Sequence, residues 1–106
     1  MAWVILGCAV VTEIIWALSL KWAAIRGGWQ TSIVPIVLSF VNMGLLALAM
    51  RGLSAGTAYA VWTGLGAVGV TIFGVMLFGE RLSPVQIGFL ALIIIGVVGT
   101  KLFAPQ

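Results

Sequence analysis

Four long stretches of apolar residues run along the chain, and short breaks rich in glycine and arginine separate them. The stretches cover residues 3–22, 31–50, 56–78 and 84–103. Each holds about 20 residues, the length at which an α-helix crosses a hydrocarbon core of roughly 30 Å. Four β-strands would not suffice, because strands in a membrane close into barrels of about eight or more. The pattern predicts an all-α membrane protein in which one domain, residues 1–106, contains four transmembrane helices.

The composition supports this prediction and removes many functions. Hydrophobic residues make up 63% of the chain and charged residues only 7%, whereas a soluble domain carries about a quarter charged residues. The chain has no His and no Asp, two Glu and one Cys. This inventory excludes a Ser-His-Asp triad, a His-ligated metal site and an internal disulfide. We predict no enzyme activity, no metal and no cofactor.

The cationic side chains lie singly near the ends of the predicted helices, where they suit lipid headgroups rather than nucleic acid. An even number of spans places both termini on one side of the membrane. That side carries Arg51 and Lys101, and the other carries Lys21, Arg26 and Arg81. Orientation depends on a charge bias that is almost missing here. Two interpretations stay open: the chain inserts both ways and pairs as an antiparallel, dual-topology dimer, or factors hidden from the sequence select one orientation.

Glu13 lies in the middle of the first predicted helix, and no other acidic residue lies so deep. An ionisable group near the bilayer centre is costly and usually has a function. Burial favours the neutral form of a carboxyl group, whereas a nearby cation favours the charged form. A proton and a cation therefore compete for one group, which is the basis of an antiporter. The alternative is a permanently protonated Glu13 that hydrogen-bonds a neighbouring helix.

Helical spacing places small and aromatic residues beside this carboxyl group. Ala9, Val10, Trp16 and Ala17 share the Glu13 face of the first helix. The small residues leave room for a ligand. The ring of Trp16 offers an aromatic face, which attracts cations through its quadrupole.

The third predicted helix carries a second aromatic pair. Tyr59 and Trp62 are three residues apart, with Thr63 and Gly66 on the same stripe. Such a pair usually serves packing alone, but opposite a buried carboxyl group it predicts part of a cation site. In the second helix, Asn42 follows Ser39 by one turn. An amide in lipid needs partners, and the sequence leaves three for Asn42: Glu13, a ligand or the next helix.

Glycines mark the last two predicted helices. Gly64, Gly66 and Gly69 match the G-x-G-x-x-G pattern of dinucleotide sites, but no strand precedes them and no acidic residue follows at the required distance. Inside a membrane helix, clustered glycines allow close packing or a bend. The fourth helix lacks a charge at its centre, and its glycines predict a contact surface; they are Gly88, Gly96 and Gly99.

Four segments together resemble a known family: Glu13 to Lys21, Gly56–Gly69, Phe78–Glu80 and Gly96–Lys101. They are similar to the small multidrug resistance family, most closely its guanidinium-exporting branch, and the similarity covers the whole chain. A Trp three residues after the Glu, as at Trp16, is typical of that branch.

The resemblance implies a fold, a site and an activity. It implies an antiparallel dimer in the cell inner membrane, in which both Glu13 side chains bind either protons or one guanidinium-type cation. It assigns Trp16, Tyr59 and Trp62 to this shared pocket. It also implies that the fourth helices form much of the dimer contact and that the third helix bends at its glycines. The partners are then the small cation, protons, the lipid bilayer and a second copy or a homologous subunit.

The chain departs from the family pattern at several positions. Asn42 stands where the family usually has Ser, and Val10 stands where the branch often has Gly. Ser54 stands where a Pro is usual. A Pro that is common early in the second helix is absent at Thr31, and the chain has Pro35 instead. The extra donor and larger side chain of Asn42 favour a guanidinyl compound with an added acceptor, such as guanylurea. Such departures are also expected in one subunit of a heterodimeric pair.

Three other functions stay open on the sequence. A broader exporter of quaternary ammonium compounds and other drugs is one, although Trp16 narrows the pocket. A passive channel lined by Asn42 and Phe40 is another, although Glu13 fits an anion channel poorly. The third is a subunit that transports only when paired with a homologue.

Overall fold

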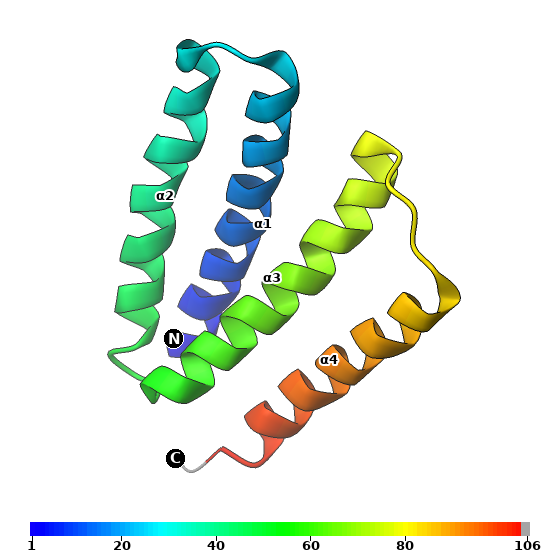
Figure 1. Ribbon diagram of the computed structural model, residues 1–106. Coiled ribbons are helices and arrows are strands. Elements are labelled where there is room, and N and C mark those ends of the chain that lie inside the picture. The colour runs from blue at the N-terminus through cyan, green and yellow to red at the C-terminus, as the bar shows by residue number, and fades with distance from the viewer. Residues whose placement is uncertain (105–106) are drawn as a thin grey trace.

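The computed structural model describes residues 1–104 and consists of four α-helices. They are α1 (Ala2–Arg26), α2 (Trp29–Ala49), α3 (Ala55–Phe78) and α4 (Pro84–Leu102) (Figure 1). Each helix is long and apolar enough to cross a membrane, which confirms the predicted all-helical fold with four spans. The start of α1 and the end of α4 lie at the same end of the molecule in Figure 1. The predicted domain also includes residues 105–106, which lie outside the described residues.

The first helix is longer than its apolar stretch suggested. It continues past Trp22 to Arg26, so the break predicted from residue 23 onward is corrected to a two-residue turn. Gly27 and Gly28 form this turn at φ 75° and 87°, a backbone region that glycine enters without steric cost. The N–H of Gly27 donates to the carbonyl oxygen of Ala23 at 2.9 Å, which closes the helix.

Polar side chains begin the last two helices. Ser54 caps α3, and its hydroxyl accepts a hydrogen bond from the Thr57 N–H at 3.3 Å. Ser83 and Gln86 form a reciprocal capping box at the start of α4, with bonds of 3.1 and 3.0 Å. Such caps satisfy backbone N–H groups that the helix itself leaves free. The resemblance led us to expect a proline at this position, and Ser54 caps the helix there instead.

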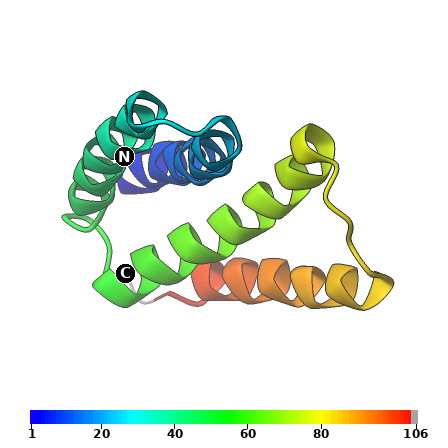
Figure 2. The same ribbon diagram turned by 45° about the horizontal axis from the view of Figure 1, so that its top comes forward.

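The helices form a thin slab rather than a closed bundle. The Cα positions extend 46 × 35 × 16 Å, and an α-helix with its side chains is itself about 10–12 Å wide. Figure 2 shows α1 and α2 as a pair, with α3 crossing from this pair toward α4. Within the described residues, the α4 backbone lies close to that of α3 alone, and α4 has no buried side chain. A single copy therefore cannot surround a polar pathway.

The core lies where α1, α2 and α3 meet, near the end of the molecule that holds the start of α1. Many of its buried members are small or branched apolar residues: Leu6, Ala9, Leu46, Ala49, Ala58 and Val61. Small residues at helix contacts let the backbones approach closely, and such packing is a principal stabilising interaction in lipid. This end of the chain therefore holds the three helices in a fixed relative position.

Three of the five glycines of α3, those of the predicted bend, each meet a side chain from another helix. A Cβ on Gly64 would lie 2.7 Å from Cγ2 of Val97 on α4, and a Cβ on Gly69 would overlap Ile14 on α1. Gly66 faces Glu13, as described below. The helix continues through all three positions, so the bend at these glycines stays a prediction, while their role in close packing is observed.

Gly64→Leu should detach α4 from α3. The new side chain would occupy the space of Val97, whose β-branched side chain has little rotamer freedom, and overpacking of this kind typically costs about 1–3 kcal/mol. We expect a lower unfolding temperature in detergent, measured by circular dichroism. Gly56→Leu is the matched control, because Gly56 lies on the same helix with open space around its Cα. An equal loss in both variants would contradict the packing role of Gly64.

An ion pair lies at the opposite end of the molecule. Lys21 Nζ lies 3.3 Å from Glu80 Oε2, and both side chains are about half exposed, at 50% and 46%. Glu80 folds back onto Gly74, whose missing side chain makes room for its carboxylate. Exposed pairs of this kind contribute little to stability. The chain has only two acidic residues, and this pair occupies Glu80. Glu13 is the other one.

Candidate functional site

A chain of hydrogen bonds links one side chain from each of the first three helices. The Asn42 side-chain amide on α2 donates from Nδ2 to Glu13 Oε1 on α1 at 2.7 Å. Trp62 on α3 donates from its indole Nε1 to Asn42 Oδ1 at 3.3 Å. Asn42 is 1% exposed and Trp62 6% exposed. The three helices therefore converge on a polar core, and Asn42 is its centre.

The bonds fix the orientation of the Asn42 amide. Its nitrogen can only donate and its oxygen can only accept, so a rotated amide would place N–H against the Trp62 N–H and oxygen against the Glu13 carboxyl group. The sequence left three possible partners for Asn42 open. The structure shows two of them at once, Glu13 on α1 and Trp62 on the neighbouring helix α3. Within residues 1–104, Oε2 of Glu13 accepts no hydrogen bond.

Gly66 makes room for the Glu13 side chain. A Cβ at Gly66 would lie 2.9 Å from Cγ of Glu13 and 3.8 Å from its Oε2. Sequence reasoning placed Gly66 on the stripe of Tyr59 and Trp62 but missed that it touches Glu13. The signal was present, because Gly66 lies one helical turn after Trp62 on the same face. Glu13 is only partly buried in a single copy.

The aromatic pair of α3 lies at the edge of this polar core. The ring centroids of Tyr59 and Trp62 are 5.4 Å apart, with the planes tilted by 48°. Trp62 is buried, whereas Tyr59 is 55% exposed. Thr63 donates its hydroxyl to the Tyr59 carbonyl oxygen at 2.8 Å. The tryptophan thus anchors the Asn42 amide, and the tyrosine presents its ring and hydroxyl outside the core.

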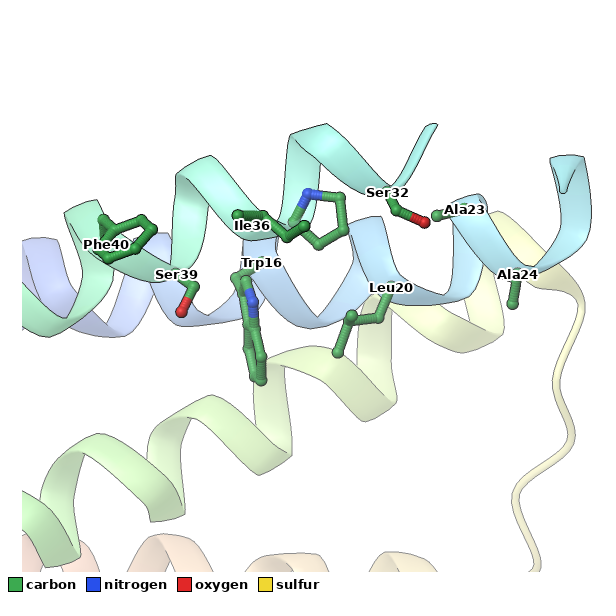
Figure 3. Close-up of a pocket in the computed structure, with 9 residues that line it drawn as sticks. Trp16, Leu20, Ala23, Ala24, Ser32, Ile36, Ser39 and Phe40 are labelled. Atoms are coloured by element: carbon green, nitrogen blue, oxygen red, sulfur yellow. The ribbon is translucent and has the colours of Figure 1, made fainter. Parts of the chain in front are cut away.

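Trp16 and Ser39 line a separate groove between α1 and α2. Figure 3 shows both side chains projecting to the same side of these helices. The groove has a volume of about 580 Å³ and includes Pro35 and the exposed Phe40, but not Glu13. Trp16 is still only one helical turn from Glu13. The predicted site residues are therefore divided between the polar core and this neighbouring groove.

Ala9 and Val10, which were predicted to line the pocket, lie in the apolar core of the chain instead of beside the Glu13 carboxyl group. Ala9 is fully buried in the apolar core, and Val10 is 8% exposed against the same cluster. Val10 also lines a second groove, toward α4, that does not include Glu13. The predicted contact glycines of α4 all face open space within the chain: Gly88, Gly96 and Gly99.

Comparison with known proteins decides the family. The profile described as Small Multidrug Resistance protein matches residues 1–93. The chain belongs to the small multidrug resistance family. Both the fold and the family membership identify a multi-pass membrane protein. The membership also confirms the resemblance that we drew from the residues.

Several small multidrug resistance relatives are similar over nearly their whole length, and each is named a guanidinium exporter. The relative from Proteus vulgaris is 47% identical over 96% of this chain and 98% of its own. The relative from Escherichia coli K12 is 45% identical over 96% of this chain and 97% of its own. The relative from Yersinia pseudotuberculosis is 48% identical over 96% and 98%.

Proposed function

We propose that this protein exports guanidinium or a small guanidinyl cation in exchange for protons, and that proton and cation compete for Glu13. The observation that carries the proposal is the hydrogen-bonded carboxyl group of Glu13 in the middle of a membrane-spanning helix. The names of the relatives, all guanidinium exporters, support this substrate class.

The chemistry of the polar core suits a flat cation rich in N–H donors. Oε2 of Glu13 is free to accept a proton or a ligand N–H, because Asn42 uses Oε1. A charge-assisted hydrogen bond of this kind is roughly twice as strong as a neutral one. The aromatic faces of Tyr59 and Trp16 add attraction for a cation, about 2 kcal/mol when water is excluded. An empty, charged carboxylate is costly in lipid, so release of the cation favours uptake of a proton.

We infer that two copies in opposite orientations, in the inner membrane, form the working transporter. A slab with a 16 Å thickness cannot enclose a path alone, and the weak charge bias between its two sides permits both orientations. The exposed side of α4 supplies a surface for the contact, and its glycines permit close approach.

Gly96→Leu should therefore weaken dimer formation at least about tenfold, the effect of 1.4 kcal/mol. The new side chain has open space within its own chain, so the fold should be kept. Gly44→Leu is the matched control, because Gly44 on α2 also faces open space. Dimer content can be measured in detergent by analytical ultracentrifugation. An unchanged dimer content in Gly96→Leu would contradict the proposal that α4 forms the dimer contact.

The proposed activity is tested with the purified chain in liposomes that contain a pH-sensitive dye. A guanidinium gradient should drive protons in the opposite direction, and liposomes without protein should show no response. Guanylurea and tetrapropylammonium, supplied in the same way, define the substrate range. Guanidinium movement without protons would indicate a channel, and a larger response to tetrapropylammonium would indicate a multidrug exporter. A folded dimer without any response would indicate a subunit that needs a homologous partner.

A further inference from the structure

A second groove lies between α1, α3 and α4, apart from the polar core. It has a volume of about 490 Å³. Val61 and Leu65 of α3 line it, together with Val97 and Val98 of α4. The α1 wall runs from Trp3 to Val10 and includes Gly7, whose missing side chain leaves open space.

The mouth of this groove is cationic. Lys101 Nζ lies over the Trp3 ring, 5.1 Å from its centroid, and both residues line the groove. The loop that carries Arg51 is at the same end, since a Cβ on Gly52 would lie 2.8 Å from the Cβ of Ala2. The acidic side chains are elsewhere, because Glu13 is in the polar core and Glu80 pairs with Lys21 at the opposite end.

We propose that this groove binds one anionic phospholipid, with its phosphate at Lys101 and an acyl chain against the apolar inner part. Lysine beside tryptophan is a typical arrangement at the headgroup level of a bilayer. The α1 wall from Trp3 to Val10 is about 10 Å long at 1.5 Å per residue. This length fits within one leaflet, about half of a 30 Å hydrocarbon core. The groove thus matches a lipid in both charge and depth.

A second copy of the chain suits this mouth less well than a lipid. One end of the molecule carries Arg51 and Lys101, and the other carries three cations against one acid, Glu80. Either end of a second copy would therefore bring positive charge toward Lys101. A lipid phosphate brings the opposite charge, and it can accept hydrogen bonds from an ammonium group that is exposed to solvent.

Native mass spectrometry of the dimer released from detergent tests the proposal. The probes are phosphatidylglycerol and phosphatidylcholine with identical acyl chains. We expect the wild type to retain phosphatidylglycerol about fivefold better, the effect of one cation near an anionic headgroup. Lys101→Gln should remove this preference, and Lys101→Arg should keep it. Gly7→Leu should lower retention of both lipids, because its side chain would enter the groove, and a Cβ at this position meets no other atom within 4 Å.

Three results would overturn the proposal. Lys101→Gln with an unchanged preference would show that the phosphate binds elsewhere. Release of phosphatidylglycerol by inorganic phosphate alone would show an anion site without a lipid tail. Lipid retention that rises when Gly96→Leu lowers the dimer content would show that a second copy covers the groove. Circular dichroism of each variant confirms that the helices are intact, so a loss of lipid is not a loss of fold.

Discussion

Glu13→Gln should reduce proton-coupled exchange of guanidinium to the background of empty liposomes. Glutamine has nearly the same size and keeps an oxygen that can accept from Asn42 Nδ2, so the hydrogen bond at 2.7 Å has a substitute. It can neither release a proton nor form an ion pair with a cation. Hydrogen bonds to charged groups are worth about 1.5–3 kcal/mol, so guanidinium affinity should also fall about 10- to 100-fold. Isothermal titration calorimetry and the liposome assay measure the two effects.

Glu13→Asp is the matched control for this experiment. It keeps the charge and the titratable proton, but its shorter side chain moves the carboxylate away from Asn42. We expect slower exchange that still moves protons against guanidinium. Proton-coupled exchange by folded Glu13→Gln would disprove the role of this carboxyl group. A variant that fails to fold is recognised by its circular dichroism and its dimer content.

Hydropathy predicted most of the fold because lipid imposes simple rules. A helix that crosses the bilayer needs about 20 apolar residues, and this alone located all four helices. The error at the end of α1 has the same origin. Ala23 and Ala24 continue the helix beyond the apolar stretch that ends at Trp22, since alanine is the best helix former. The helix ends instead at Arg26, because the backbone reaches a positive φ at Gly27.

Periodicity predicted which residues lie near Glu13 but not what they touch. Ala9 and Val10 share a helix side with Glu13, yet both pack into the apolar core of the same chain. The apolar stripe of a helix spans 100° or more, wide enough to meet two neighbours at once. Only the positions of α2 and α3 decide which part of the stripe each neighbour covers. This is why Gly66 was assigned to a bend rather than to its contact with Glu13.

Asn42→Leu should cause the largest loss of stability among single changes in the polar core. Leucine has a similar size but neither donates nor accepts hydrogen bonds. It would leave the buried Trp62 N–H unpaired and remove the donor from Glu13 Oε1. An unsatisfied buried polar group costs about 1–3 kcal/mol. We expect a lower unfolding temperature together with a higher KM for guanidinium, since the carboxyl group loses its orientation.

Asn42→Ser separates the positioning of Glu13 from the stability of the core. A hydroxyl group can donate to Glu13 and accept from Trp62, but the serine side chain is shorter and leaves space beside the carboxyl group. We expect proton-coupled transport to be kept, with a changed order of affinity between guanidinium and guanylurea. If Asn42 served only packing, Asn42→Leu would transport as well as Asn42→Ser at temperatures where both are folded. Transport by Asn42→Ser alone would instead show that Glu13 needs a hydrogen-bond donor from α2 and that the size of this donor sets substrate choice.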